Sequence, residues 1–239
     1  MKRAVLNLAG TVGKTTIVGH MLAPRMPGAP VLAIESINAA ADSLGIEVEK
    51  VKGDQFRRIF ADLVALDDAI IDIGASNIED FLSGLAQFRG AHLEVDQYLV
   101  PVIPENKVQA ETIATIKMLS SIGVPRDRIH IVFNRVRTGP QDEFPQVWAF
   151  AAAERTCIAD PGAAVLENEV FDLLGQRGLT LAAALRDPTD YRARLRELGR
   201  NGDPALWQEY MDLHTIKALG TSADANLDEV FACLNRENE

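Results

Sequence analysis

The segment from Ala4 to Thr16, AVLNLAGTVGKTT, constrains this chain more than any other part. It reads as an apolar strand, a short loop with two glycines, and Lys-Thr-Thr at the start of an amphipathic helix. Glycines let consecutive backbone N–H groups turn toward phosphate oxygens, and a helix start adds free donors and a positive dipole end. The segment therefore predicts a phosphate-binding loop made of Gly10, Thr11, Val12, Gly13, Lys14, Thr15 and Thr16.

Two side chains of this loop have distinct predicted roles. Lys14 is placed to reach the β- and γ-phosphates of a nucleotide, and the Thr15 hydroxyl is placed to ligate Mg²⁺. The ordinary Walker A pattern has a glycine five positions before Gly13, where this chain has Leu8. The loop is therefore a variant, and the strand before it and the helix after it favour phosphate binding over a chance Gly-Lys-Thr turn.

Composition limits the class of protein. Hydrophobic residues make up 47% and charged residues 24% of 239 residues, which is typical of one globular domain. No apolar run approaches the length that spans a bilayer, so we expect a cytoplasmic protein with no membrane partner. Cys157 and Cys233 stand far apart in the sequence, which favours neither a zinc site nor a disulfide framework.

Strand-like and helix-like segments alternate along the first two thirds of the chain. Strands are predicted at 4–8, 30–35, 69–73, 98–103, 129–133 and 156–159, and helices at 15–22, 56–66, 78–87 and 107–122. This alternation predicts an α/β fold, a mostly parallel twisted sheet flanked by helices as in P-loop NTPases. We expect a nucleotide-binding core over 1–162 and, over 163–239, a region of short helices packed on the same domain. Those helices either complete the core or form a partner surface.

The net charge of −10 opposes broad attraction to DNA, because Lys and Arg supply the sequence-independent part of that affinity. Any DNA contact is expected to be indirect or confined to a patch. Two arginine clusters are candidates, Arg126, Arg128, Arg135 and Arg137, and separately Arg192, Arg194, Arg196 and Arg200.

Acidic residues are needed near a bound triphosphate to hold Mg²⁺ or its water. Asp72 ends the apolar run Ala69–Ile71 and precedes Gly74, a strand-to-loop transition that suits this role. A buried strand seldom carries an unpaired carboxylate. Glu35, at the end of the second predicted strand, is the next candidate ligand for the metal.

The segment Ala9–Thr16 resembles the loop of ParA/MinD ATPases, whose usual form is Lys-Gly-Gly-Val-Gly-Lys-Thr-Thr. Four segments in order, 5–16, 34–38, 72–77 and Val100-Pro101, resemble more closely the plasmid stability and transfer proteins StbB and TraL. The resemblance spans about the first 160 residues. It implies ATP or ADP with Mg²⁺ as ligands, Asn134 as a base-binding residue, and the turn Asp160–Gly162 as a second loop beside the base.

This chain departs from the ParA/MinD pattern at two positions. The family's signature lysine, which reaches the partner's phosphates in a dimer, is replaced by Ala9, and its catalytic aspartate falls on Ile37. Neither side chain here orients water or accepts a proton. These departures predict weak or absent ATP hydrolysis, with the catalytic residues unknown. The sequence is compatible with a homodimer and does not specify the oligomeric state.

The resemblance implies a nucleotide-dependent switch in plasmid stability, partition or conjugative transfer, read by a plasmid-encoded partner such as a small DNA-binding protein. A metabolic ATP-dependent ligase or small-molecule kinase on the same scaffold is the alternative. A MinD-like membrane regulator would need a basic amphipathic C-terminal helix, and residues 226–239 are acidic instead.

Overall fold

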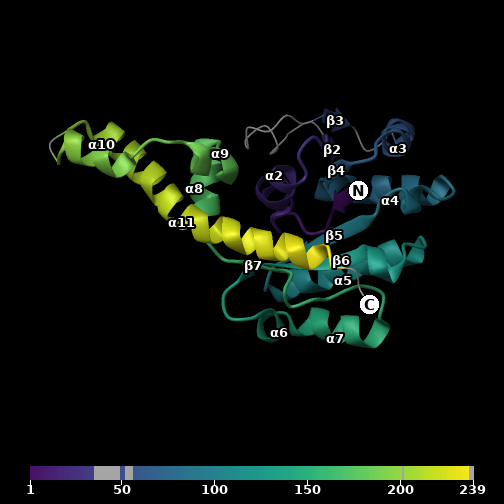
Figure 1. Cartoon of the computed structure of the whole chain (residues 1–239). Helices are drawn as coiled ribbons and strands as arrows, with labels where there is room; N and C mark the ends of the chain where they lie inside the picture. Colours follow the sequence, from purple (N-terminus) through teal and green to yellow (C-terminus); the bar gives the residue numbers. More distant parts are fainter. Residues whose placement is uncertain (35–48, 52–55, 201, 237–239) are drawn as a thin grey trace.

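A computed structural model describes residues 1–34, 49–51, 56–200 and 202–236. Its described strands form one sheet of seven in the order β3-β2-β4-β1-β5-β6-β7, and every pairing is parallel. Figure 1 shows helices on both sides of this twisted sheet. The predicted α/β class is confirmed. The strands are β1 (Lys2–Val5), β2 (Val31–Ile34), β3 (Glu49–Val51), β4 (Ala69–Ile73), β5 (Gln97–Val102), β6 (Ile129–Val136) and β7 (Ala164–Leu166).

One face of the sheet packs against helices α3, α4, α5 and α7. These run over Phe56–Ala65, Ile78–Gln87, Asn106–Ser121 and Pro145–Glu154, and the short α6 (Pro140–Glu143) precedes the last of them. Ala4, Ile71 and Val100 are among the strand residues that enter this larger core. The neighbouring strand residues Val5 and Ile70 point into a second core on the other face, because successive side chains of a strand alternate between faces.

The second face packs against the helix after β1 and against the C-terminal helices. The helix after β1 runs from Lys14 to Arg25. It consists of α1 (Lys14–Thr16), η1 with π-type hydrogen bonds (Ile17–Leu22) and α2 (Ala23–Arg25). The C-terminal helices are α8 (Val170–Arg177), α9 (Leu181–Arg186), α10 (Tyr191–Leu198) and α11 (Pro204–Leu234). Because both faces are covered, the central strands are built mainly of apolar residues.

The last predicted strand is wrong. Residues 156–159 contribute only an isolated bridge, between Ile158 and His130, and the strand at this edge is β7, six residues further on. Helices α6 and α7 and strand β3 were also not predicted. Pairing at a sheet edge depends on the neighbouring strand and its available backbone groups. The local apolar pattern of a segment does not reveal these groups.

The C-terminal helices are not all short, because α11 extends over 31 residues. Pro204 opens this helix at its first position, and the Asp203 carboxylate caps it by accepting from the backbone N–H groups of Ala205 and Leu206. Gly220 lies inside α11, where an added Cβ would come within 3.0 Å of Leu181. The glycine therefore allows α9 to pack closely on α11.

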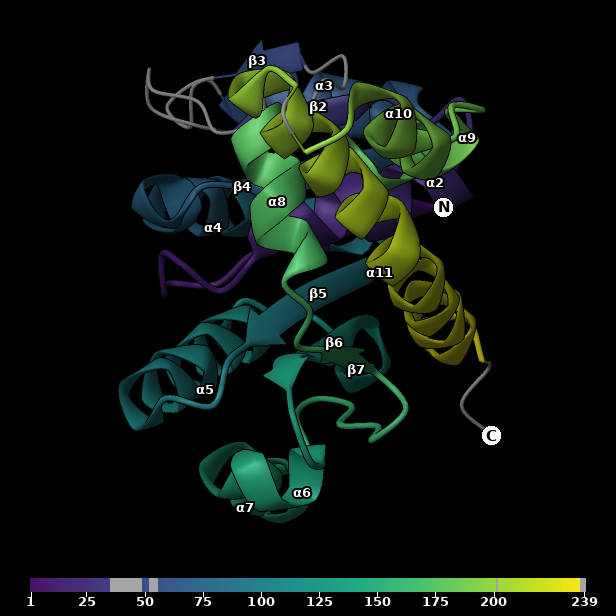
Figure 2. The same ribbon diagram turned by 90° about the vertical axis from the view of Figure 1, so that its left-hand side faces the viewer.

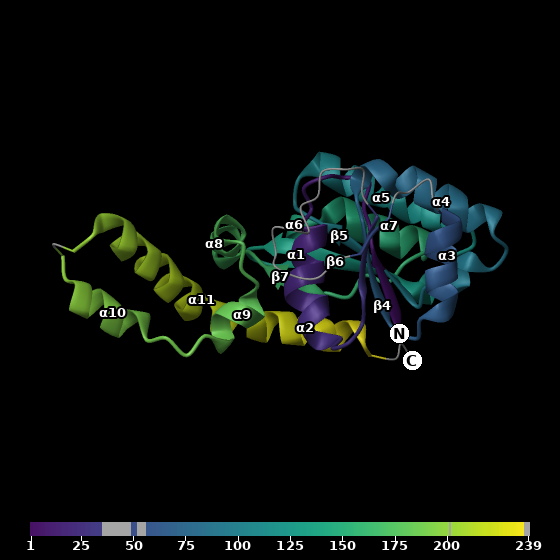
Figure 3. The same cartoon turned by 90° about the horizontal axis from the view of Figure 1, so that it is seen from above.

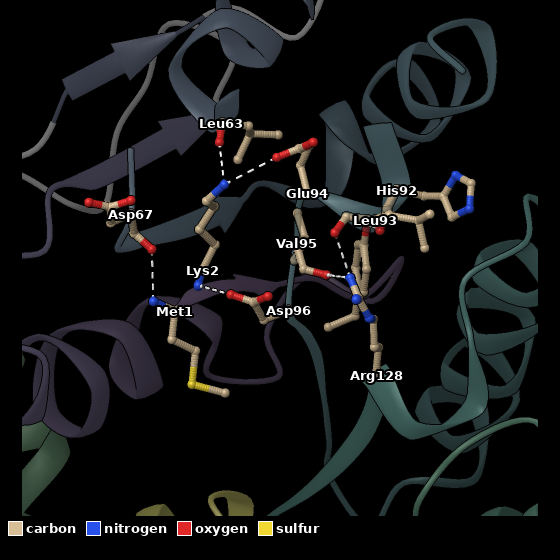
Figure 4. A network of polar contacts seen from close by, with 11 residues as sticks. Met1, Lys2, Leu63, Asp67, His92, Leu93, Glu94, Val95, Asp96 and Arg128 are labelled. Atoms are coloured by element: carbon tan, nitrogen blue, oxygen red, sulfur yellow. Dashed lines mark hydrogen bonds and ion pairs between the residues drawn. The ribbon is translucent and has the colours of Figure 1, made fainter. Parts of the chain in front are cut away.

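The carboxyl end of α11 packs against the second face of the sheet. Gln97 Nε2 donates to the carbonyl oxygen of Leu234 at 2.7 Å, and the buried guanidinium of Arg3 contacts Asn235 Oδ1. Burial lowers the pKa of Arg3 to about 10. Figure 4 shows the adjoining polar contacts at this end of the sheet, where Lys2 N donates to Asp96 Oδ2 and Arg128 Nη1 donates to the carbonyl oxygens of Leu93 and Val95.

The other end of α11 leaves the body of the molecule. Figures 1 and 3 show α10 and the amino-terminal half of α11 side by side, projecting away from the sheet. Among the described residues, no helix is long and apolar enough to cross a membrane.

Candidate functional site

Three strands bring the predicted site residues to one edge of the sheet. The phosphate-binding loop follows β1, Asp72 lies near the end of β4, and Asn134 lies near the end of β6. Asp72 pairs in register with Val5 of β1, one strand away. The carboxyl ends of parallel strands are where α/β sheets bind ligands. The structure therefore places the loop, the carboxylate and the amide together.

The start of the loop is held from behind by α5. Asn7 is fully buried, and its Nδ2 donates to the carbonyl oxygen of Pro101 and to Thr112 Oγ1, each at 2.7 Å. Its Oδ1 accepts from the backbone N–H of Ala9 at 2.9 Å, and Thr115 Oγ1 accepts from the N–H of Leu8 at 3.1 Å. These contacts satisfy buried groups that would otherwise be costly, and they fix where the loop leaves the strand. No feature of the sequence alone connects α5 to the loop.

Lys14 lies inside the loop that it follows. Its ammonium group donates to the carbonyl oxygens of Asn7 at 3.0 Å and Ala9 at 2.7 Å, and only 6% of the residue is exposed. A buried ammonium surrounded by loop backbone is a point charge well suited to phosphate oxygens. The lysine is therefore positioned where the sequence predicts a phosphate to bind.

Thr15 and Asp72 form the pair of oxygens expected beside a metal. Thr15 Oγ1 donates to Asp72 Oδ2 at 2.9 Å, and Asp72 is 2% exposed. A hydroxyl and a carboxylate are hard oxygen ligands, which Mg²⁺ prefers and usually supplements with water and substrate phosphate. Their contact brings together two residues that are 57 positions apart. The residues present fit a Mg²⁺–nucleotide.

Gly13 and Asn134 contact each other at the other side of the loop. Gly13 has a left-handed backbone with φ of 84°, and an added Cβ would lie 2.4 Å from Asn134 Nδ2. The same amide nitrogen donates to the carbonyl oxygen of Val12 at 2.8 Å. Asn134 Oδ1 accepts from the N–H of Arg135, a non-glycine residue with φ of 56°. Asn134, which the resemblance implies as a base-binding residue, therefore fixes the loop.

A cavity of about 500 Å³ opens beside these two residues and Thr16. Its far wall comes from the segment after β7 and the first turn of α8, and Figure 2 shows α8 passing close to the helix after β1. Sequence reasoning placed the second base-flanking loop at Asp160–Gly162, but that turn precedes β7 and lies at the opposite end of the strand. The lining residues are Gly13, Thr16, Asn134, Arg135, Leu166, Glu167, Asn168, Glu169, Phe171 and Asp172.

The remaining predicted positions fall into two groups. Glu35 and Ile37 lie outside the described residues. Gly10 and Thr11 are exposed at the tip of the loop, and Val12 is buried against Ala9 and Ile103. Among the described residues, no group of three or more His, Cys, Asp and Glu side chains could hold a metal ion by itself.

Several solved structures share this architecture. An ATP complex of a McdA variant from Cyanothece aligns over 100% of this chain and 97% of its own, with a TM-score of 0.53 and 15% identity. MinD from Aquifex aeolicus aligns over 100% and 98%, with a TM-score of 0.55 and 13% identity. A second Aquifex aeolicus MinD structure, in complex with MinC, gives a TM-score of 0.56 and 14% identity over 100% of this chain and 97% of that one.

The chain therefore shares the fold of McdA and MinD. Identities this low show the fold alone. A scan against protein-family models and a search of curated proteins each found no match.

Proposed function

We propose that this protein binds ATP and ADP with Mg²⁺ at the loop Gly10–Thr16. The observation that carries the proposal is that Lys14 and Thr15, which follow β1, lie beside Asp72 of the neighbouring β4, with the Thr15–Asp72 contact at 2.9 Å. Lys14 would hold the β- and γ-phosphates, and Thr15 and Asp72 would hold the metal or its waters. The metal supplies charge neutralisation to the triphosphate.

The 500 Å³ cavity suits the base and sugar, because it begins at Gly13 and Thr16 and is bounded by Asn134. In that arrangement Asn134 orients the base, and the residues after β7 form the opposite wall. Glu35 is a proposed second metal ligand, because it ends the second predicted strand.

Replacing Lys14 tests this proposal. In Lys14→Ala the phosphates lose their principal buried cation, so we expect nucleotide affinity to fall by at least ~100-fold. Isothermal titration calorimetry with Mg²⁺–ATP and Mg²⁺–ADP measures the change. Lys107→Ala is the matched control, because the Lys107 side chain is 87% exposed on α5 and forms an i,i+4 ion pair with Glu111. Equal affinities for the Lys14 variant and the unmodified protein would refute the assignment.

We infer, from the resemblance to StbB and TraL, that the bound nucleotide acts as a switch in plasmid stability, partition or conjugative transfer. In this role the ATP and ADP states present different surfaces, and a plasmid-encoded partner distinguishes them. A small DNA-binding protein encoded beside this chain would support the role. Neighbouring genes of a biosynthetic pathway would favour the ligase or kinase instead.

Hydrolysis by the isolated protein is expected to be weak. The positions that supply catalytic groups in ParA/MinD proteins hold Ala9 and Ile37. Ala9 is 4% exposed and packs with Val12 and Ile103, so its side chain supplies no cation. Groups of this kind contribute on the order of 10³ to 10⁵ in rate.

Phosphate release from purified protein measures this expectation. Because catalytic groups act as a unit, only the double variant Ala9→Lys, Ile37→Asp is expected to gain turnover, and each single variant should gain little. Adding Lys14→Ala to the double variant should abolish any gain. Rapid release by the unmodified protein would show that another residue positions the water.

A further inference from the structure

The projecting arm, which we define as α10 with residues 203–215 of α11, has no core of its own. Helix α10 contains no buried residue, and the first buried residue of α11 is Ile216. The arm nevertheless contains Leu195, Leu198, Leu206, Trp207, Tyr210 and Met211. Half-exposed apolar side chains on a projecting helix pair are typical of a surface that another molecule covers.

The arm is held rigidly where it leaves the body. Lys217 Nζ donates to the carbonyl oxygen of Thr189 at 2.8 Å and lies 5.2 Å from the ring centroid of Tyr191. Tyr191 in turn contacts the carboxylate of Asp187, and Arg177 Nη2 of α8 reaches Asp212 Oδ2 at 2.6 Å. Asp190 and Asp203 cap the two arm helices. A preorganised element of this kind loses little entropy on association.

One apolar stripe of α11 faces α10, and a second stripe lies around the helix from it. The ring of Tyr210 lies 5.9 Å from that of Tyr191, so the stripe of Leu206, Tyr210 and Leu213 faces α10. Trp207 and Met211 lie one position further along, about 100° around the helix. Trp207 is 37% exposed. Trp and Met are enriched at protein interfaces, and they contribute nothing to phosphate recognition.

The charges of the arm distinguish between a nucleic acid and a second copy of the chain as its partner. Residues 190–200 carry four arginines against Asp190 and Glu197, whereas residues 203–213 carry Asp203, Glu209 and Asp212 with no Lys or Arg. Asp203 caps α11 and Asp212 pairs with Arg177 within the chain, so Glu209 is the carboxylate that would face a second copy. In the part of the chain that the structure describes, no ion pair engages Arg192, Arg196 or Arg200. A nucleic acid would match α10 and be repelled by the adjacent stretch of α11. A second arm, rotated by a two-fold axis, would match both helices.

We propose that two copies of this chain associate through their arms, α10 of each copy lying against the acidic half of α11 of the other. The apolar stripe of Trp207 and Met211 is then buried in a four-helix bundle with two-fold symmetry, in which the same surface is used twice. This contact involves no residue of the nucleotide site. The proposed dimer can therefore be tested independently of the proposed function.

Sedimentation equilibrium of the full chain tests the proposal. We expect a dimer of twice the 26.0 kDa chain mass, with or without Mg²⁺–ATP. Trp207→Glu with Met211→Glu should raise the dissociation constant at least ~30-fold, the effect of losing one interface hot spot. Val64→Glu is the matched control, because Val64 is 57% exposed on α3 and far from the arm, and it should leave the dimer unchanged.

A charge exchange provides a second test that does not depend on the apolar stripe. Arg196→Glu should weaken the dimer, and adding Glu209→Arg should restore it, because both copies then carry the exchanged signs. Circular dichroism confirms that each variant is folded. A monomer at every soluble concentration would overturn the proposal. So would a dimer that the arm variants leave unchanged, or a dimer that forms only with nucleotide and is lost in Lys14→Ala.

Discussion

At the scale of single residues, Gly13 shows how the loop depends on backbone conformation. Its φ of 84° lies in the left-handed region, and its Cα faces the amide of Asn134. A side chain there is strained and also displaces Asn134, which holds the carbonyl oxygen of Val12. Gly10, in the same loop, has open space around an added Cβ and lacks a positive φ.

We therefore predict that Gly13→Ala lowers the free energy of unfolding by about 1–2 kcal/mol, the cost of a left-handed non-glycine residue. Gly10→Ala should change it by less than about 0.5 kcal/mol. Urea denaturation followed by circular dichroism measures both. Equal midpoints for the two variants would show that neither the backbone conformation nor the contact with Asn134 constrains position 13.

At the scale of elements, His20 joins the helix after the loop to the C-terminal helices. Its Nδ1 accepts from the backbone N–H of Leu181 at 3.2 Å, and its ring lies 5.6 Å from that of Phe171, which lines the nucleotide cavity. Burial lowers the pKa of His20 to about 4. The imidazole is therefore neutral in the folded protein at pH 6, where the unfolded chain binds a proton.

This difference makes stability depend on pH. Because the folded pKa is below the unfolded value near 6.5, the unfolded state binds more protons, and stability is lost as the pH falls from about 6.5 toward 4. We expect His20 to contribute a loss on the order of 3 kcal/mol over that range. Burial also lowers the pKa of His130, so His20→Gln should reduce this dependence without removing it. Denaturant titrations at several pH values measure the free energy of unfolding. An unchanged slope of this free energy against pH in His20→Gln would contradict the prediction.

At the scale of the whole molecule, net charge and the use of individual arginines argue against direct DNA binding. In the first arginine cluster, Arg128 donates to the carbonyl oxygens of Leu93 and Val95, and Arg137 pairs with Glu167. The arginines of α10 lie on a helix that packs against α11, whose residues 203–213 carry three carboxylates and no Lys or Arg. An overall charge of −10 adds long-range repulsion.

We predict only weak binding of duplex DNA by the isolated protein at physiological salt. A gel-shift titration, with and without Mg²⁺–ATP, measures it. A partner protein that restores binding would support the indirect role. Tight binding by the unmodified chain that is lost in Arg192→Glu with Arg196→Glu would instead make α10 a DNA-contacting helix.

Local sequence determined the loop and most of the sheet. The strand at 69–73 and the helix at 78–87 were predicted to the residue, because buried strands and amphipathic helices have their own apolar periods. Lys14, Thr15 and Gly13 could be named because glycine freedom and helix-start donors are properties of neighbouring residues. The same local reasoning placed Asp72 at the end of a buried strand.

Only the tertiary structure decided how distant segments meet. The contact of Thr15 with Asp72, the support of Asn7 by Thr112 and Thr115, and the wall of the cavity after β7 all depend on strand order. The predicted edge strand at 156–159 failed, and β7 was missed, because edge pairing is set by the neighbouring strand. The long α11 was not predicted, because Gly220 weakens a helix locally. In the tertiary structure this glycine allows α9 to pack closely on α11, which favours the continuous helix.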